Sequence, residues 1–421
     1  MYTQSFVPAP TAMPPQTPIR PADLHGVQRL AIDATLRMTD LVEAMHLNIS
    51  RAPWIFGEAA QGRTRGITGL VYHSIRTITA GVGSTLDATL GLAVKSLEAA
   101  LDSSASSPAR EAVLAAANGV FGDHLADSGN PLAIPMRLRH QGRPLLLQRA
   151  ALGGTFPAAS GKLLVLVHGL CMNDLQWRRN GHDHGAALAR DGGWQPLYLH
   201  YNSGRHVSTN GREFAELLET LVAQWPVPVT ELVILAHSMG GLLTRSACAH
   251  AALSQQRWPE RLRKIVFLGT PHHGAPLERH GHGLQRLVGI SPYTAPLARL
   301  GMIRSAGITD LRHGNVLDQD WQEQDRFGLP HDTRCPLPLP AGVKCYAVAA
   351  TSGRRAGDLK DAWLGDGLVP VDSALGRHAE ARHCLSFNAA HQSLYHETSH
   401  WDLLDKAEVY EQVRQWLCDP R

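Results

Sequence analysis

The chain has 421 residues, of which 44% are hydrophobic and 18% are charged. This composition supplies enough apolar side chains for one large domain or two domains, and it excludes wholesale disorder, which is typical of chains with few large apolar residues. The formal net charge is only +3, and basic and acidic residues are mixed along the chain. We therefore expect no binding to nucleic acid.

Residues 1–22 are rich in proline, and we expect them to be a disordered tail. No charged side chain precedes Arg20, and no stretch of about 18 residues stays apolar. We therefore predict neither a secretory signal nor a membrane span, and we expect a cytoplasmic location. Six cysteines in a chain of this length favour reduced, mostly buried thiols; a short loop closed by Cys335 and Cys345 is the less favoured alternative.

Residues 23–131 are expected to form a helical N-terminal region. Within it, apolar residues recur every three or four positions from Ile67 to Leu101, which predicts one long amphipathic helix. Such a helix packs most simply on another part of the chain or on a second copy. The sharper alternative is that residues 67–101 dock on a lipid or storage-polymer surface, which would place the protein at the periphery of such a surface.

From Ile134 onward the pattern changes, first to an alternation around Gly142 that predicts a β-hairpin. Runs rich in Val, Ile and Leu then alternate with segments of helical length, so we predict a mostly parallel sheet with helices on both faces, in one α/β domain over 132–421. The predicted strands are 162–168, 194–201, 231–238, 264–270, 343–351 and 383–388. The predicted helices are 211–225, 240–256 and one starting at residue 405.

About seventy residues separate two of these strands, many more than an ordinary connection needs. We therefore predict an insertion over about 277–340 that forms a cap or lid. Its segments LQRLVGI (284–290) and APLARLGMI (295–303) carry apolar residues that could line an acyl pocket.

The segment VILAHSMGGL places Ser238 where a buried strand runs directly into a helix. Small residues, Ala236 and Gly240, stand two positions before and after this serine, as the tight turn of a nucleophile elbow requires. Ala236 stands where the common motif has glycine. The pattern indicates a serine nucleophile.

Acyl transfer also needs two backbone N–H groups directed at the developing oxyanion. One is expected from Met239, directly after the nucleophile. The other is expected from Leu170, in the loop HGL that follows the first parallel strand, with Gly169 allowing the backbone to turn. We interpret His168 as a structural histidine.

A serine hydroxyl needs an imidazole base, and the base needs a carboxylate to orient it. In this architecture both follow the serine, with the acid first. Asp366 lies in the glycine-flanked segment GDGLVP and is the predicted acid. Three histidines follow; we favour His400 as the base, with His396 second and His391 third.

Two other groups of histidines show no recognised ligand spacing for a metal. They lie at 272, 273, 280 and 282, and at 182 and 184. We predict no metal and no cofactor.

The motifs VHGLCMND, AHSMGGL, LGTPHHGAPL, GDGLVPV and SHWDLL, in this order, resemble the α/β-hydrolase lipases and esterases, in the branch of GPI inositol-deacylases and bacterial triacylglycerol lipases. The resemblance covers the chain from about Leu132. It implies an α/β-hydrolase fold and a serine hydrolase that cleaves carboxylic esters, small or lipid-like, through an acyl-enzyme. Acyl transfer to another acceptor, amide cleavage and a non-catalytic binding protein of this fold are the alternatives.

Overall fold

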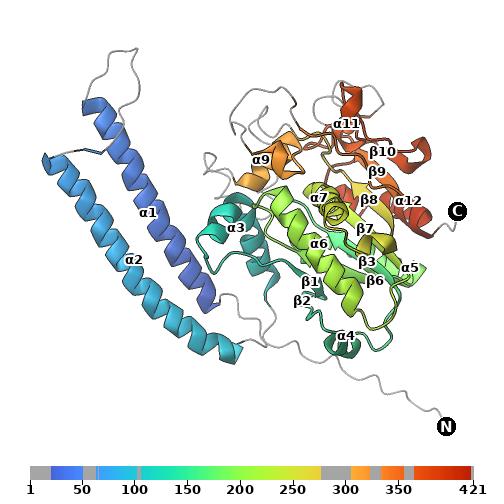
Figure 1. Ribbon diagram of the computed structural model, residues 1–421, viewed down its shortest axis with the longest axis horizontal. Helices are drawn as coiled ribbons and strands as arrows, with labels where there is room; N and C mark the ends of the chain where they lie inside the picture. The colour runs from blue at the N-terminus through green and yellow to red at the C-terminus, as the bar shows by residue number, and fades with distance from the viewer. Residues whose placement is uncertain are drawn as a thin grey trace, which may run out of the picture. The chain divides into compact units, whose positions relative to one another are not determined.

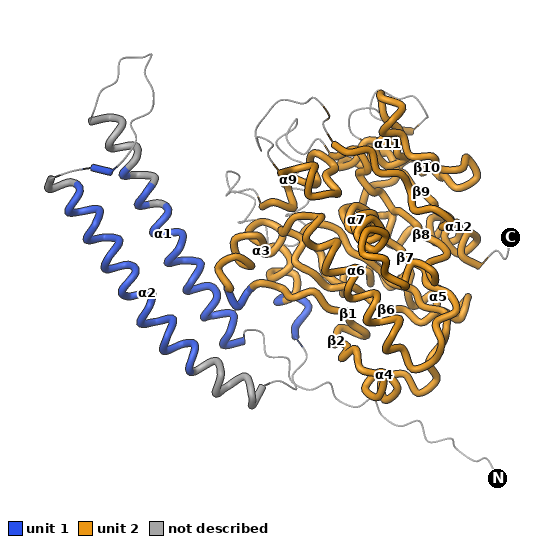
Figure 2. The backbone as a smooth tube through the Cα atoms, viewed as in Figure 1, with its two compact units in different colours: residues 1–110, 130–132 blue, residues 111–129, 133–421 orange. Residues whose placement is uncertain are grey.

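The computed structural model describes residues 20–50, 63–64, 66–101, 106–275, 305–322, 332, 334–354 and 365–418 (Figure 1). The chain divides into two compact units, one of residues 1–110 and 130–132, the other of residues 111–129 and 133–421 (Figure 2). The expected tail lies outside the described residues up to position 19. So do both apolar segments of the expected lid, 284–290 and 295–303.

The first unit contains a hairpin of two long helices, α1 (Pro21–Ser50) and α2 (Gly66–Leu101) (Figure 1). The predicted helix over 67–101 is therefore confirmed. The helices run antiparallel, because His25 near the start of α1 bonds Asp87 at 2.7 Å, whereas Asp40 further along bonds Arg76 at 2.7 Å. Near the middle of the pair the Ile32 side chain packs directly on Gly83, where a Cβ atom would come within 2.8 Å of it.

Within the described residues, the second unit is built around an eight-stranded sheet with the strand order β10-β9-β8-β7-β3-β6-β1-β2. The first six strands in this order, β10, β9, β8, β7, β3 and β6, are parallel to one another. Strand β1 runs antiparallel to β6. The strands are β1 (Arg137–His140), β2 (Arg143–Pro144), β3 (Lys162–Val167), β6 (Gln195–His200), β7 (Glu231–His237), β8 (Leu262–Leu268), β9 (Lys344–Ala350) and β10 (Gln392–Tyr395). A small second sheet pairs β4 (Arg178–Arg179) with β5 (His182–Asp183).

Helices cover both faces of the sheet, because its central strands are apolar on both sides (Figure 1). On one face, side chains of the strands form a core cluster with α5 (His184–Gly192) and α12 (Ala407–Cys418). The other face carries α6 (Val207–Gln224) and α7 (Met239–Leu253). The sheet and its flanking helices form the predicted α/β-hydrolase fold.

Apart from α3, the remaining helices of the described residues are short. They are α4 (Arg149–Thr155), α9 (Ala306–His313) and α11 (Val371–Ala374), with the 3-10 helices η1 (Asp174–Trp177), η2 (Trp258–Arg261), η4 (Asp318–Asp320), η5 (Ala381–His383), η6 (Ala389–His391) and η7 (Asp402–Leu404).

Helix α3 (Pro108–Asp127) joins the second unit from residue 111, so the boundary differs from the one expected near Leu132. The reason is packing. A Cβ on Gly119 would lie 2.1 Å from the Cys171 sulfur. Because glycine has no Cβ, α3 can pack directly against the loop after β3, which carries Cys171. The side chain of Asn118 also accepts a hydrogen bond from the backbone of Ile134 at 2.9 Å.

The expected last strand at 383–388 was wrong, and the last strand is β10 instead. Leu385 and Phe387 are buried while Cys384 is exposed, so the segment does alternate in the way that predicted a strand. It nevertheless has no neighbouring strand to pair with, whereas β10 pairs in parallel with β9. Alternating buried and exposed side chains show that one side of a segment is buried. They do not show that a second strand lies beside it to form hydrogen bonds.

All six cysteines are free thiols, including Cys335 and Cys345. No helix among the residues that the structure describes has the length and apolarity needed to span a membrane.

Candidate active site

Ser238 stands at the junction of β7 and α7, at the carboxyl edge of the parallel sheet. Its backbone has φ 54° and ψ −127°, a conformation that costs a non-glycine residue of order 1–3 kcal/mol. The neighbouring glycines provide the space for this turn. A Cβ on Gly240 would lie 2.5 Å from the carbonyl oxygen of Val167, and a Cβ on Gly169 would lie 2.9 Å from the Cβ of Ser238.

The structure brings Asp366 and His400 together, although 34 positions separate them. Nδ1 of His400 donates to Oδ2 of Asp366 at 2.6 Å, and both residues are almost fully buried. The other carboxylate oxygen accepts the backbone N–H groups of Leu368 and Val369 at 3.0 and 2.9 Å. The carboxylate is therefore fixed in place, and it holds His400 in the tautomer that leaves Nε2 able to accept a proton.

His237, the residue before Ser238, connects the elbow to the loop that carries His400. Its Nε2–H donates to the carbonyl oxygen of His400 at 3.2 Å, and the two ring centroids are 4.6 Å apart. Burial, and secondarily the nearby His400 ring, hold the pKa of His237 well below its usual range. The ring is therefore neutral. Sequence analysis did not identify this residue, whose only local signal is its position beside the serine.

The two alternative bases lie on either side of β10. The ring of His391 packs on Tyr346, with centroids 4.3 Å apart. His396 directly follows β10, and its carbonyl oxygen accepts from the Thr398 hydroxyl. The histidine hydrogen-bonded to Asp366 is His400.

The loop after β3 places Leu170 next to the elbow, because its neighbour Gly169 lies against Ser238. Leu170 and Met239 are both buried. The following amide, that of Cys171, is engaged with the Ser203 hydroxyl at 3.0 Å. These contacts hold the backbone of the loop beside the serine.

His168 has the structural role expected of it. Its Nδ1–H donates to the Gly169 carbonyl at 2.8 Å, and its ring stacks on Tyr201 at 4.4 Å. The Tyr201 hydroxyl in turn donates to the His168 carbonyl at 2.9 Å. Desolvation lowers the pKa of His168 to about 4, so the ring is neutral at neutral pH.

A buried ionic cluster anchors the far end of the same loop. Glu111, Asp174 and His200 are the one group of potential metal ligands found among the described residues. Nη1 of Arg139 lies 2.8 Å from Glu111 and 2.9 Å from Asp174, so a guanidinium already serves as the cation of this cluster. The cluster joins α3, β1 and η1, and sequence analysis missed it because its members lie far apart in the chain.

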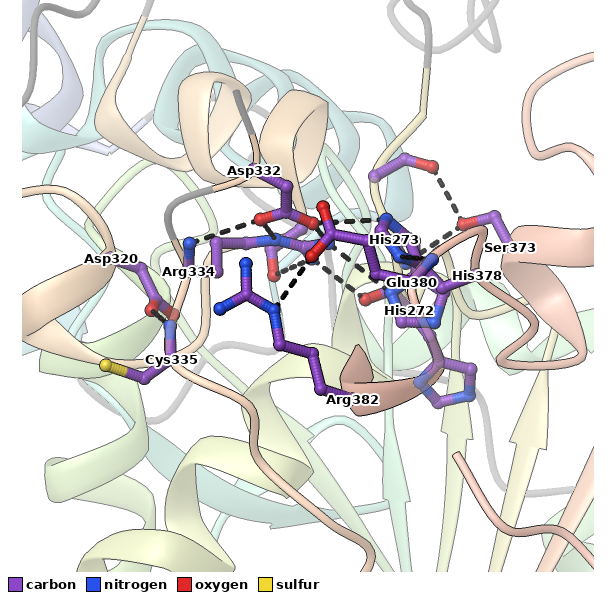
Figure 3. A network of polar contacts seen from close by, with 12 residues as sticks. His272, His273, Asp320, Asp332, Arg334, Cys335, Ser373, His378, Glu380 and Arg382 are labelled. Carbon is purple, nitrogen blue, oxygen red and sulfur yellow. Dashed lines mark hydrogen bonds and ion pairs between the residues drawn. The ribbon is translucent and has the colours of Figure 1, made fainter. Parts of the chain in front are cut away.

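The two groups of histidines without recognised ligand spacing differ in their contacts. Among the described residues, the His272 ring has no hydrogen-bond partner at either nitrogen and packs against Phe267 and Phe387. Nε2 of His182 is 2.9 Å from Nδ1 of His184, whose Nε2–H donates to the Leu403 carbonyl. Figure 3 shows the loop with His272 and His273 in a polar network, in which Arg334 pairs with Asp332 at 2.6 Å and donates to the His272 carbonyl at 3.2 Å. The histidines at 280 and 282 lie outside the described residues.

The fold and this arrangement of side chains define a class, the α/β hydrolases, whose fold supports serine hydrolase chemistry in general. Residues 158–336, less than half of the chain, match the family model described as the PGAP1-like alpha/beta domain. The match confirms the resemblance that the sequence motifs indicated. A search of curated proteins found no match.

Several solved structures are similar in overall fold. The mature Bacillus licheniformis lipase BlEst2 is 17% identical over 61% of this chain and 91% of its own, with a TM-score of 0.40. Aspergillus fumigatus lipase B is 13% identical over 64% of this chain and 57% of its own, with a TM-score of 0.38. The RedJ thioesterase of Streptomyces coelicolor is 15% identical over 62% of this chain and 91% of its own, with a TM-score of 0.35. At such TM-scores these likenesses assign no chemistry to this chain.

Proposed function

We propose that this protein is a serine hydrolase that cleaves carboxylic esters through an acyl-enzyme. Ser238 is the nucleophile, His400 the general base and Asp366 the group that orients the base. The proposal is carried by the strained Ser238 backbone together with a buried Asp366–His400 hydrogen bond of 2.6 Å, in a loop that His237, the neighbour of Ser238, contacts. A fold retains such strain where it serves the chemistry of the site.

The reaction begins when Nε2 of His400 takes the hydroxyl proton of Ser238 as its oxygen attacks the ester carbonyl. The carbonyl oxygen becomes an oxyanion, which the backbone N–H groups of Leu170 and Met239 stabilise. His400 then gives the proton to the departing alcohol. Water repeats the sequence on the acyl-enzyme, which releases the acid and restores the serine.

Asp366 and His237 act on the base from two sides. Asp366 stabilises the imidazolium that His400 becomes during each half-reaction. The ring centroid of His237 lies 4.6 Å from that of His400. The pKa of His237 is held well below the usual range, so the ring stays neutral and adds no competing positive charge.

The substrate class that we propose is a small-molecule or lipid ester with an apolar acyl chain.

The first experiment is labelling with a fluorophosphonate probe, followed by peptide mapping. We expect one labelled residue, Ser238, and we expect Ser238→Ala to lower turnover of an activated ester by a factor of about 10⁴ to 10⁶. Ser254→Ala, an exposed serine at the end of α7, is the matched control and should leave activity unchanged. A label on another residue, or more than a few per cent of activity in Ser238→Ala, would contradict the proposal.

Product analysis distinguishes the alternatives that use the same three residues. With an alcohol added in competition with water, a hydrolase forms mainly the free acid, whereas an acyltransferase forms mainly the new ester. A binding protein of this fold would bind an ester without either product and without fluorophosphonate labelling.

A further inference from the structure

The outward side of α2 is unusual for a surface helix, because it is apolar and carries no charge. The exposed residues of α2 from Leu70 to Thr89 include no Asp, Glu, Lys or Arg, and His73 is the one titratable side chain among them. Large aliphatic side chains on this side are between 40% and 66% exposed. They are Leu70, Val71, Ile75, Ile78, Val82 and Leu86, which we call the α2 outer face.

The charged residues of the same stretch are turned toward α1. Arg76 pairs with Asp40 at 2.7 Å and also contacts Glu43. Asp87 pairs with His25 at 2.7 Å and with Arg29 at 3.3 Å. The hairpin therefore places its ion pairs between the two helices and leaves the α2 outer face without charge.

The border of the α2 outer face points to a surface rather than to a partner helix. At 100° per residue, five of its six side chains lie within about 80° of the helix circumference, and Leu70 widens the face to about 160°. A helix that pairs with another helix needs only a narrow apolar stripe, commonly bordered by charged residues. The other exposed positions from Leu70 to Thr89 instead hold no Asp, Glu, Lys or Arg. They are His73, Ser74, Thr77, Ala80, Gly81, Ser84, Thr85, Ala88 and Thr89.

The absence of Lys and Arg also distinguishes between an anionic membrane and an uncharged apolar surface as the binding partner. Helices that bind anionic membranes carry Lys and Arg on their polar side, and the exposed positions from Leu70 to Thr89 have none. The described part of the second unit offers no matching patch, because its exposed large hydrophobic residues are Val113, Leu146 and Leu253, in three different elements. An uncharged apolar phase is the partner that fits.

We propose that the α2 outer face docks the protein on the surface of an uncharged, water-insoluble ester, such as a neutral-lipid droplet. The α2 outer face enters the apolar phase, while the ion pairs with α1 stay on the side toward water. Docking holds the linked hydrolase unit at the interface where its substrate is concentrated. The inference rests on the proposed esterase function for the class of substrate, and on the hairpin alone for the binding.

The test is co-flotation of the full-length chain with triolein droplets coated with phosphatidylcholine, in low and high salt. We expect the wild type to float with the droplets at both salt concentrations, because no ion pair contributes to binding. Val71→Glu/Ile78→Glu places two carboxylates in the α2 outer face and should lower the bound fraction about tenfold or more. Turnover of a soluble short-chain ester should be unchanged in this variant.

Two matched controls make the result specific. Ala31→Glu/Ala34→Glu places the same two charges at exposed positions of α1 and should bind as the wild type does. Ser238→Ala should also bind as the wild type does, so a failure of docking is distinguishable from a failure of the proposed chemistry.

Four outcomes would overturn the proposal. The first is that the wild type fails to float, and the second is that the Val71→Glu/Ile78→Glu variant floats equally well. Alternatively, light scattering shows a dimer that does not float and that Val71→Glu/Ile78→Glu dissociates, in which case a second copy covers the α2 outer face. Lastly, the same variant lowers the unfolding midpoint of the hydrolase unit, in which case the face packs on its own chain.

Discussion

At the scale of single residues, the position of His400, the proposed base, depends on a contact made by its carbonyl group as well as on the bond to its ring. Asp366 fixes the His400 ring through Nδ1, and His237 fixes the His400 backbone through a hydrogen bond of 3.2 Å. His237 precedes Ser238 directly, so this bond links the segment that carries Ser238 to the loop that carries His400. We therefore propose that His237 is a positioning residue for His400.

Replacing His237 with phenylalanine should impair catalysis more than folding. Phe keeps a ring in the cavity but leaves the His400 carbonyl without its donor, which costs about 1–3 kcal/mol, or a factor of about 5 to 150 in kcat/KM if expressed in the transition state. The measurement is kcat/KM across pH. His237→Gln, which keeps an N–H donor, should recover much of the loss and restore the wild-type pH profile.

A purely structural role for His237 predicts a different result. In that case Phe and Gln would lower the unfolding midpoint to a similar extent, and the pH profile of the remaining activity would match that of the wild type.

At the scale of elements, α3 belongs with the hydrolase unit and the α1–α2 hairpin does not. Two residues just before and at the start of α9 bond α3 directly. The Ser305 hydroxyl donates to the Gly119 carbonyl at 2.6 Å, and the Ala306 amide donates to Asp123 at 2.8 Å. The start of α3 is also capped locally, because the Ser107 hydroxyl accepts the Arg110 amide at 3.2 Å.

Two truncations should therefore behave differently. A chain that starts at Ser106 keeps α3 and its cap, and we expect it to fold and to turn over soluble esters at a rate close to that of the full chain. A chain that starts at Pro131 exposes the surface that α3 covers, and it should lose about 5 kcal/mol or more from removal of the buried α3 side chains. Urea unfolding and turnover of a soluble ester are the measurements. Equal stability of the two chains would show that α3 is dispensable.

At the scale of the whole molecule, buried neutral histidines couple stability to pH. Burial lowers the pKa of both His168 and His184 from the usual 6.5 to about 4. In the unfolded chain each titrates near its usual value, so below about pH 6.5 the unfolded state takes up protons that the folded state does not. Stability is therefore complete above this pH and falls as the pH decreases toward 4.

Urea unfolding at pH 7.5 and at pH 5 measures this coupling. Each of the two histidines should reduce the free energy of unfolding by about 2 kcal/mol at pH 5, since one pKa unit corresponds to 1.36 kcal/mol. His184→Gln should make the pH dependence shallower. A free energy of unfolding that is constant between these pH values would show that the two rings are not held neutral by the fold.

Features that depend on neighbouring residues could be predicted from the sequence. The strands of the parallel sheet are buried on both faces and appear as continuous apolar runs, and five of the six predicted strands are present within about two residues. The elbow is also local, because strand, serine and helix follow one another and the small neighbours are adjacent. The helix over 67–101 and the hairpin at Gly142 belong to the same group.

Features that depend on distant partners were decided only by the tertiary structure. Chain order left three histidines as possible bases, and the fold placed His400 against Asp366. The contact of His237 with His400 and the shared guanidinium of Arg139 join segments far apart in sequence. A sequence pattern records how buried each side chain is and which backbone conformation it favours. It does not record which distant group lies opposite, because the packing of whole elements determines that.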